Sequence, residues 1–509
     1  MLLGDIYKEQ LQKTPDKAAL IFKGSSISYT EFDEAVSLTA DTLLSLGIKR
    51  GDRVALFMRN RTELLEFYFA CFSIGAIAVP INHRYMQDEV VYAVNHCSAR
   101  ILIADDELYE VVEDIHNRVP TVNRVFSLGF GSGDEEHSWE STAACAPRGL
   151  ELPVVKREDP AMVMYTSGST EKPKGVTYTH AALLNFCMSR KVTFGLTEDE
   201  IGLAATAICH CGGSVGMAFP TLYIGGTVII METPDPHLFL ECVAKYRPNR
   251  TLILPAQLLD VLDAPSARDT DFSCFSDVLT GGDYISLDLY ERFKDITGLE
   301  LNQLYGMTEC EGMCFTPPSL PIRYGSVGTP RHGVEMRLVD KDGKDVSTGE
   351  PGAILIKSGS MTIGYWNDEK NTSLAFTQDG WLITGDEGRQ DEDGYYYFVG
   401  RIKEIIIKRG SNVAPGEVEE VLDDHPQVSL SGVVGTPDKR HGELIHAFIE
   451  LKPGLENPPG EEDLRAYTSK RLAAYKVPDR WTIVETLPRN DIGKIDRRGL
   501  HALAKKLDA

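Results

Sequence analysis

Apolar residues recur at helical spacing near the start of the chain. In the segment 31–46, "EFDEAVSLTADTLLSL", one helical face gathers Phe32, Ala35, Leu43 and Leu46. Thr30 is the candidate N-cap, with Asp33 three residues further on, and Gly47 is expected to end the helix. The pattern therefore predicts an amphipathic helix that covers a core.

Short apolar runs follow this helix at regular intervals. They predict strands at 53–58, 76–81 and 100–105, with helices between them, one of which begins at about residue 88. Strands that alternate with helices form parallel sheets covered on both faces. The first part of the chain is therefore expected to have an α/β fold with two sheet subdomains, and the polar stretch 129–153 is expected to be a surface excursion.

The spacing of apolar residues changes between residues 315 and 400. Short β-like runs, "EMRLVD", "GAILIKS" and "YYYFVG", are separated by Asp-Gly, Gly-Glu and Pro-Gly turns, which predicts an antiparallel β subdomain. After residue 400 the pattern returns to helices and strands with more charge. A small α+β carboxy-terminal domain is expected from about residue 404.

Charge and length narrow the class of protein. At roughly 150 residues per domain, 509 residues correspond to about three structural units. The 52 basic and 75 acidic residues give a net charge of −23, which disfavours nucleic acid as the main partner but leaves room for a local phosphate site. The amino-terminal residues contain no apolar signal region, and the longest apolar stretch, 67–81, is too short to cross a bilayer. A cytoplasmic protein is expected.

The segment 165–180, "YTSGSTEKPKGVTYTH", has the composition of a phosphate-binding loop. Glycines let backbone N–H groups approach phosphate oxygens, hydroxyls donate hydrogen bonds, and Lys174 supplies a positive charge. A Walker loop has its lysine after the last glycine and leads into a helix, whereas here the order is "KPKG" and "VTYTH" favours a strand. The loop is expected to join two strands. On composition alone, such a cluster is more often a solvated hairpin turn.

Four further motifs favour the phosphate-binding interpretation. "QLYGMTE", "WLITGDEG", "GRIKE" and "PRNDIGKIDRR" follow the loop in that order. Together the five motifs resemble those of the adenylate-forming acyl- and aryl-CoA ligases, which are related to nonribosomal peptide adenylation domains and luciferase. The resemblance covers essentially the whole chain. It implies a large domain at 1–402, a mobile lid domain at 403–509, and a hinge at Lys403.

The resemblance implies which residues contact the nucleotide. The phosphate contacts are Thr166, Ser167, Gly168, Ser169, Thr170 and Lys174. The adenine and ribose contacts are Gly281, Gly282, Asp283, Tyr305, Asp386 and Arg401. Glu171 stands where the family usually has glycine, and its side chain is expected to point to solvent, because a carboxylate about 6 Å from the phosphates would repel them by about 3 kcal/mol.

The same resemblance implies the catalytic groups and the acid pocket. Thr308 would lie beside the α-phosphate, Glu309 would bind Mg²⁺, and Lys494 would bridge the substrate carboxylate and the phosphate. The pocket would be bordered by His210, Cys211, Gly212, Gly213 and Met313. A hydrogen-bonded buried histidine is the alternative for His210. His441 stands where many relatives have a tryptophan that stacks on the nucleotide of CoA.

The resemblance implies an ATP-dependent acid:CoA ligase. Such an enzyme forms an acyl-adenylate and pyrophosphate, then an acyl-CoA thioester and AMP, with ATP, Mg²⁺ and coenzyme A as cofactor and co-substrates. The small pocket residues favour an aryl or a medium-to-long acyl substrate. Two alternatives stay open: an enzyme that loads the acyl group onto a carrier protein, and a catalytically silent nucleotide-binding homologue. The resemblance also allows a homodimer.

Overall fold

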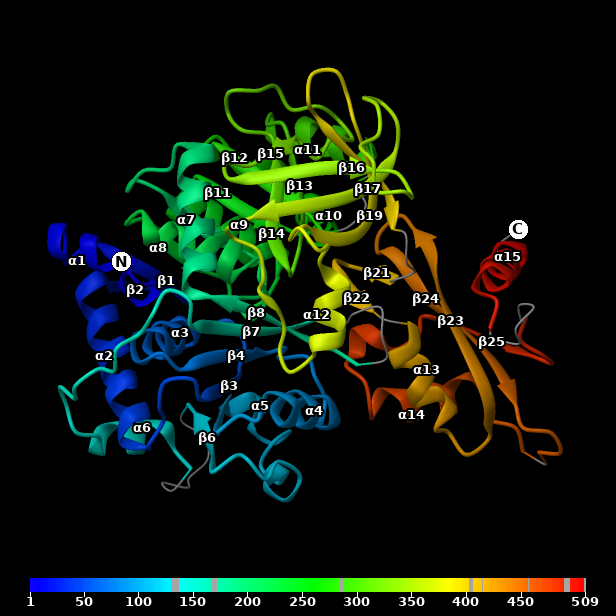
Figure 1. The fold of residues 1–509 in the computed structure, drawn as a ribbon, viewed down its shortest axis with the longest axis horizontal. Coiled ribbons are helices and arrows are strands. Elements are labelled where there is room, and N and C mark those ends of the chain that lie inside the picture. Colours follow the sequence, from blue (N-terminus) through cyan, green and yellow to red (C-terminus); the bar gives the residue numbers. More distant parts are fainter. Residues whose placement is uncertain are drawn as a thin grey trace.

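The computed structural model describes residues 1–129, 137–166, 172–282, 285, 287–401, 406–413, 415–455, 457–488 and 495–507. A large body occupies the left and centre of Figure 1, and a smaller carboxy-terminal domain lies to its right. The helices are α1 (Lys8–Lys13), α2 (Tyr29–Ser45), α3 (Thr62–Ile74), α4 (Gln87–Cys97), α5 (Asp106–Tyr109), α6 (Trp139–Cys145), α7 (His180–Phe194), α8 (Phe219–Tyr223), α9 (Pro236–Tyr246), α10 (Pro255–Asp263), α11 (Leu287–Thr297), α12 (Glu369–Ala375), α13 (Pro415–Asp423), α14 (Glu461–Ser469) and α15 (Arg497–Leu507).

The first sheet of the body contains the strands predicted between residues 53 and 105. Its order is β18 (Gly364–Tyr365), β8 (Lys174–Thr179), β7 (Pro160–Thr166), β4 (Ile77–Ile81), β3 (Arg53–Phe57), β5 (Ile101–Asp105) and β6 (Arg124–Leu128). The pairs from β7 through β6 are parallel, whereas β7 and β8 are antiparallel. The prediction that the phosphate-type loop joins two strands is therefore confirmed.

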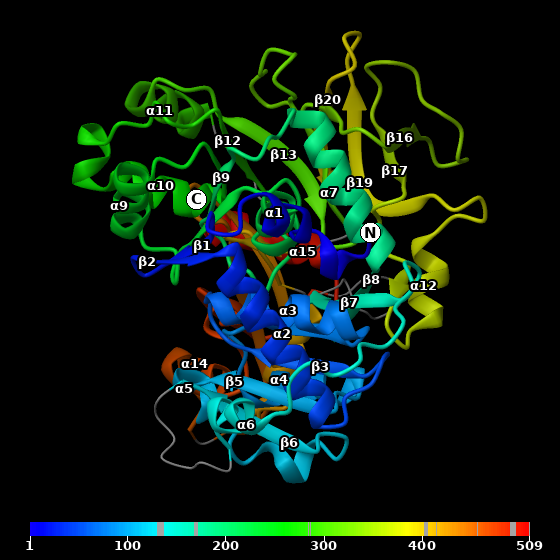
Figure 2. The same cartoon turned by 90° about the vertical axis from the view of Figure 1, so that its left-hand side faces the viewer.

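The second sheet of the body lies beside the first, in the upper half of Figure 2. Its order is β15 (Thr329–Pro330), β14 (Cys310–Phe315), β13 (Asn302–Met307), β12 (Asp277–Gly281), β11 (Arg250–Ile253), β9 (Ile201–Ala204), β10 (Thr227–Ile230), β1 (Ala18–Phe22) and β2 (Ser25–Ser28). Strands β13, β12, β11, β9, β10 and β1 are parallel along this path.

The two sheets share one hydrophobic core. On β3, Val54 and Leu56 face a cluster that also contains residues of α3 and α7, while Ala55 and Phe57 face α4. The shared cluster reaches strands of the second sheet, whose opposite face packs against α9, α10 and α11. The body therefore has α–β–α–β–α layers, as expected when parallel strands are buried on both faces.

The first helix begins at a different residue from the one predicted. The N-cap of α2 is Ser28, whose hydroxyl accepts from Glu31 N at 3.2 Å while Ser28 N donates to the Glu31 carboxylate at 2.8 Å. Thr30 lies inside the helix, so its assignment as N-cap was wrong. Both Ser28–Glu31 and Thr30–Asp33 have the spacing of a capping box, and the structure uses the first. The helix ends just before Gly47, as predicted.

The predicted β subdomain and small domain are both present. The order of the antiparallel sheet is β16 (Val334–Val339), β17 (Gly352–Ser358), β19 (Leu382–Gln390) and β20 (Tyr396–Arg401). The order of the small-domain sheet is β22 (Ser411–Val413), β21 (Ile406–Lys408), β24 (Gly442–Leu451) and β23 (Val428–Asp438), with β25 (Arg480–Val484) on β24. One sheet ends at Arg401 and the next begins at Ile406, so the predicted hinge at Lys403 lies between them, outside the described residues.

The polar excursion at 129–153 contains structure that the sequence pattern did not predict. Its described part includes α6, in which Trp139 is buried against Phe67 and Phe126. Among the helices that the structure describes, none combines the length and apolar character needed to cross a membrane.

Candidate active site

The candidate site residues follow the carboxyl ends of parallel strands. Gly281 is the last residue of β12, Thr308 and Glu309 come directly after β13, and His210 lies in the connection that follows β9. These strands are neighbours in one sheet, so their carboxyl ends meet at one edge. Ligands of open α/β sheets bind at this edge.

Tyr305 and Asp386 are in direct contact, although 81 positions separate them in the sequence. The Tyr305 hydroxyl donates to Asp386 Oδ2 at 2.7 Å, and both side chains are buried. Burial, and then the charge of Asp386, raise the pKa of Tyr305 well above its usual range, so the phenol stays protonated and donates. The contact joins β13 to β19 and brings together two residues predicted to bind the nucleoside.

Asp386 is also the cross-strand partner of Arg401 in the ladder between β19 and β20. The side chain of Arg401 lies outside the described part of the chain. Phe398, two-fifths exposed, has its ring centroid 6.1 Å from that of Tyr305. Phe398 is therefore the solvent-exposed member of this pair, whereas Tyr305 and Asp386 are buried.

Glu309 is a buried carboxylate at the end of the hairpin between β13 and β14. Tyr365, on β18, donates its hydroxyl to Glu309 Oε1 at 2.7 Å, and Lys174 Nζ lies 4.8 Å from the centroid of the Tyr365 ring. Burial and the charge of Glu309 raise the pKa of Tyr365, so this hydroxyl stays a donor. A carboxylate beside a lysine of the phosphate-type loop fits Mg²⁺ bound to phosphate, since this hard cation takes oxygen ligands.

Thr308 is held by a tyrosine that sequence analysis did not single out. The hydroxyl of Tyr178, on β8, donates to the carbonyl oxygen of Thr308 at 2.6 Å, and the Thr308 hydroxyl is 3.9 Å from Cys211 Sγ. Tyr178 is almost completely buried, so the bond is shielded from water. Thr308, which is expected beside the α-phosphate, and Cys211, which is expected in the acid pocket, are therefore neighbours.

The residues predicted for the acid pocket lie at two depths. Cys211 and Gly212 are half-buried, whereas Gly213 is buried and Met313 is fully buried in the cluster that contains Tyr305. A Cβ on Gly213 would come within 2.5 Å of the carbonyl oxygen of Ala207, whereas one on Gly212 would meet nothing closer than 3.5 Å. Only glycine therefore fits at position 213, because a side chain would clash with the backbone of Ala207. At position 212 a side chain could be accommodated, so glycine leaves unfilled space there.

His210 lies in the connection that follows β9 and is exposed. The surrounding protein, and then the charge of Arg84, lower the pKa of its imidazole to about 4, so the ring is neutral at pH 7. Close by, Cys209 Sγ is 3.7 Å from Nδ1 of His83, which follows β4 of the first sheet. The carboxyl ends of the parallel strands in the two body sheets thus meet beside His210.

The phosphate-type loop is described only at its two ends. Thr166 and Lys174 are paired across the β7–β8 ladder, so both ends of the loop are fixed. A pocket of about 250 Å³ lies beside Lys174, between α4 and α12. Several predicted contacts lie outside the described residues: Ser167, Gly168, Ser169, Thr170, Glu171, Asp283, Lys403 and Lys494.

Two glycines shape the nucleotide side of the site. A Cβ on Gly281 would lie 2.5 Å from the carbonyl oxygen of Leu304, so no other residue fits between β12 and β13. Gly282 follows with φ of +80°, which L-residues rarely adopt. The backbone turn after β12 therefore depends on both glycines of "TGGD".

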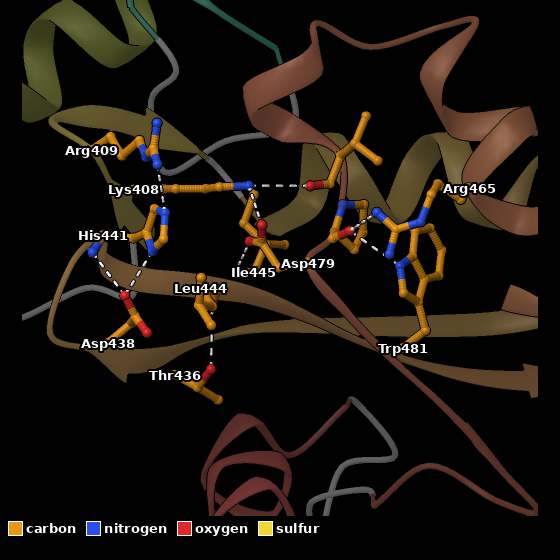
Figure 3. Close-up of polar contacts among 12 residues, drawn as sticks. Lys408, Arg409, Thr436, Asp438, His441, Leu444, Ile445, Arg465, Asp479 and Trp481 are labelled. Atoms are coloured by element: carbon orange, nitrogen blue, oxygen red, sulfur yellow. Dashed lines mark hydrogen bonds and ion pairs between the residues drawn. The ribbon is translucent and has the colours of Figure 1, made fainter. Parts of the chain in front are cut away.

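Basic residues of the small domain gather where β21 ends and β24 begins (Figure 3). Arg409 donates to His441 Nε2 at 2.7 Å, and His441 Nδ1 is 2.7 Å from Asp438 Oδ1. Arginine is a donor only, so Nε2 of His441 accepts and Nδ1 carries the proton toward Asp438. A Cβ on the next residue, Gly410, would lie 2.9 Å from the side chain of Leu254, at the end of β11. His441 therefore orients Arg409 at the domain junction.

Comparisons with known proteins identify the family. The chain matches the model of the AMP-binding enzymes over residues 7–366 and that of the AMP-binding enzyme C-terminal domain over residues 417–494. It is 33% identical to a feruloyl-CoA synthase from an Amycolatopsis species, covering 97% of both chains, and 34% identical to the 2-succinylbenzoate–CoA ligase of Geobacillus kaustophilus, covering 98% of both.

Solved structures agree with this assignment. The amide bond synthetase McbA from Marinactinospora thermotolerans superposes with a TM-score of 0.89 at 28% identity, and 99% of each chain is covered. A double mutant of o-succinylbenzoate CoA synthetase from Bacillus subtilis, bound to a product analogue, gives a TM-score of 0.87 at 28% identity, with 98% of each chain covered. The chain belongs to the AMP-binding enzyme family, and it has the two-domain fold of the adenylate-forming enzymes.

Proposed function

We propose that this enzyme is an ATP-dependent carboxylic acid:CoA ligase of the AMP-forming type. The observation that carries the proposal is the meeting of Tyr305, Asp386, Thr308 and Glu309 at one sheet edge, next to the pocket residues Cys211 and Gly212. Nucleotide contacts, a carboxylate for Mg²⁺ and a site for the acid are thus neighbours, which is what formation of an acyl-adenylate requires.

In the first half-reaction the substrate carboxylate attacks the α-phosphorus of ATP and pyrophosphate leaves. The nucleophile is already ionised, so the protein acts by positioning and by stabilising charge. Asp386 would hold the ribose, Glu309 would hold Mg²⁺, and Thr308 would donate to the α-phosphate. Mg²⁺, when bound, neutralises charge on the phosphate oxygens. Lys494 would bridge the two substrates.

The charge of the domain junction supports CoA as the acyl acceptor. In a protein of net charge −23, this junction brings the charges of Arg84, Lys408 and Arg409 close together, and it also contains Arg440, which pairs with Asp260 of the body. The nucleotide of CoA carries several phosphate charges, whereas the phosphopantetheine arm of a carrier protein carries a single phosphodiester charge. A cluster of basic side chains therefore favours CoA. Its thiol would attack the acyl carbonyl of the adenylate, with release of AMP and of the thiol proton.

The proposed second half-reaction is supported by the position of the small domain. Ile495 packs with Leu487 and Leu500 of the small domain, and α15 lies on the side of that domain away from the body (Figure 1). The edge that meets the body instead holds Gly410, Arg440 and Lys476.

The acid is proposed to be an aryl acid or a medium-to-long acyl chain. The space beside Gly212 and the small side chain of Cys211 leave room for more than an acetyl group. The similarity to the feruloyl- and 2-succinylbenzoate–CoA ligases favours the aryl class.

An ATP–pyrophosphate exchange assay tests the first half-reaction. Short, medium and long fatty acids, benzoates, hydroxycinnamates and amino acids would be compared, and exchange is expected with at least one aryl or longer-chain acid. Lys494→Ala should lower this exchange a few hundredfold, equivalent to about 3–4 kcal/mol, yet leave thioester formation from supplied acyl-adenylate intact. Exchange with none of the acids would instead support a catalytically silent homologue.

A second assay identifies the acceptor. Free CoA, a holo-carrier protein and a simple amine would each be added to the pre-formed acyl-adenylate. The proposal requires that CoA be acylated fastest. A preference for the carrier would support the relationship to the fatty acid–[acyl-carrier-protein] ligase ScoC of Streptomyces coeruleorubidus, which is 31% identical. A preference for the amine would support the likeness to McbA.

A further inference from the structure

A fully buried lysine joins the small domain to the body. Lys476, whose side chain is 0% exposed, has its Nζ 2.7 Å from Glu89 Oε1 and 2.5 Å from Glu417 Oε1. Glu89 belongs to α4 of the body, whereas Glu417 belongs to α13 of the small domain. We call these three residues the junction cluster. It contains one ion pair within the small domain and one between the domains.

The chain around Lys476 is inserted into the body. Ala473 is fully buried in the hydrophobic cluster that α4 shares with the first sheet. The hydroxyl of Tyr475 accepts a hydrogen bond from Asn82 Nδ2 at 3.1 Å, and the guanidinium of Arg84 lies 4.8 Å from the centroid of the Tyr475 ring. The junction cluster is therefore surrounded by packed residues of both domains and shielded from water.

The charge state of Lys476 follows from its neighbours. Burial alone lowers the pKa of the ammonium group, but Tyr85, Tyr475 and the two carboxylates offset this effect and raise its pKa above the usual value. The ammonium group is therefore charged at neutral pH. A buried charge is stable only while its partners are in place, because removing one partner leaves the charge without compensation.

We infer that Glu89 is a positioning residue for the thioester-forming half-reaction and acts through Lys476. This inference rests on the proposed function. When the small domain turns to bring Lys494 to the site, Lys476 and Glu417 move together and keep their ion pair, whereas the pair between Lys476 and Glu89 must separate. The interdomain pair therefore favours the arrangement in which the basic junction faces the body, and it favours that arrangement alone.

Glu89→Gln tests this inference with little disturbance of the fold. Glu89 Oε2 also accepts from Met86 N at 3.0 Å at the start of α4, and glutamine keeps an acceptor for this bond. The variant should convert supplied acyl-adenylate and CoA to thioester about tenfold more slowly, while pyrophosphate exchange stays within twofold of the wild type. Asp88→Asn is the matched control, since Asp88 lies on the same helix but pairs with Arg118 on the surface.

Tyr475→Phe provides a second test from the small-domain side. It removes the hydrogen bond from Asn82, so thioester formation should fall about two- to threefold with exchange unchanged. An equal fall in both half-reactions, or no change in either, would overturn the inference. If the wild-type enzyme itself formed no acyl-CoA, the proposed function would fail before the variants were compared, so the two failures are distinguishable.

Discussion

Two buried ion clusters in this protein have the same chemistry and different surroundings. The junction cluster of Glu89, Glu417 and Lys476 crosses from the body to the small domain. The body cluster, Glu200, Arg250 and Asp277, lies wholly within the second sheet, with Arg250 Nε 2.8 Å from Glu200 Oε1 and Arg250 Nη1 3.7 Å from Asp277 Oδ2. In both clusters every side chain is less than a tenth exposed.

The position of each cluster in the fold explains its role. Arg250 and Asp277 are the first residues of β11 and β12, and Glu200 comes directly before β9, so the body cluster lies at the amino ends of these parallel strands. The ligand edge is at the opposite, carboxyl ends. No step of the proposed reaction separates these charges, whereas the proposed rotation of the small domain would separate Lys476 from Glu89. The body cluster is therefore expected to stabilise the fold, and the junction cluster is proposed to select an arrangement of the domains.

The largest expected effect comes from opening the body cluster. Arg250→Met would leave Glu200 and Asp277 buried beside Arg190, and we expect a loss of about 3–5 kcal/mol in the free energy of unfolding. Urea denaturation followed by tryptophan fluorescence measures this loss. The ratio of the two half-reaction rates, per folded enzyme, should not change. Arg268→Ala, which breaks the exposed pair with Asp295, is the matched control and should lose less than about 1 kcal/mol.

A smaller effect is expected at Arg331, another buried cation of the body. Its guanidinium donates to the Gly312 carbonyl and to the Ser189 hydroxyl, each at 2.7 Å, and so holds the strand that follows Glu309. Arg331→Lys would lose this forked contact, with about 2–3 kcal/mol of stability. Both half-reactions should slow by the same factor because the whole site shifts. A loss confined to thioester formation would mean that a buried charge within the body also favours one arrangement of the two domains.

Glu66 shows what a half-buried carboxyl does outside such clusters. Burial, and then the charge of Glu63, raise its pKa to about 8, from an ordinary value of 4.5. The folded protein therefore keeps this proton at pH values where the unfolded chain has lost it, so stability falls as pH rises from about 4.5 to 8. Between pH 5 and pH 8, the free energy of unfolding of Glu66→Gln should therefore fall less than that of the wild type. We expect a difference of about 1–2 kcal/mol, because the side chain is only partly shielded from water.

The ionised carboxylate of the neighbouring Glu63 is expected to stabilise the fold, in contrast to that of Glu66. Burial raises its pKa, but the hydrogen bond and charge of Arg61 outweigh burial and hold the pKa below the usual value. The stability that Glu63 contributes is therefore present at both pH 5 and pH 8 and is lost only as the pH falls below about 4.5. At pH 8, Glu63→Gln should lower the urea midpoint of unfolding, whereas Glu66→Gln should raise it. The same response in both variants would refute the assigned causes.

Sequence patterns predicted the elements well, because each is set by local periodicity. The strand predicted at 53–58 is Arg53–Phe57, and the helix predicted from about residue 88 begins at Gln87. The N-cap of α2 was wrong because two overlapping capping boxes have the same spacing, and only tertiary packing decides between them. Trp139 on α6 was missed because a buried aromatic residue in a polar stretch gives no periodic signal.

The site was predictable where motifs mark strand ends. Tyr305 and Asp386 were both named from motifs, and the structure joins them by a hydrogen bond. Tyr178 and Tyr365, which hold Thr308 and Glu309, were not named, since their roles arise from the pairing of β8 with β18 and not from local sequence. The single signal for Lys476 was a charged residue between apolar neighbours in "AAYKVP". Its partner on α4, 387 positions away, is visible only in the fold.

The smallest effect is expected from the exposed pair at the domain junction. Arg440 Nη2 lies 2.6 Å from Asp260 Oδ1, so this pair crosses the same boundary as the junction cluster, but its side chains are 56% and 32% exposed. Water solvates both groups in either arrangement of the domains, and such pairs contribute about 0–1 kcal/mol. Asp260→Asn breaks the pair and keeps the charge of Arg440 for CoA. The ratio of half-reaction rates should therefore stay within twofold of the wild type. A shift as large as that of Glu89→Gln would mean that crossing the boundary, and not burial, gives an ion pair control over the small domain.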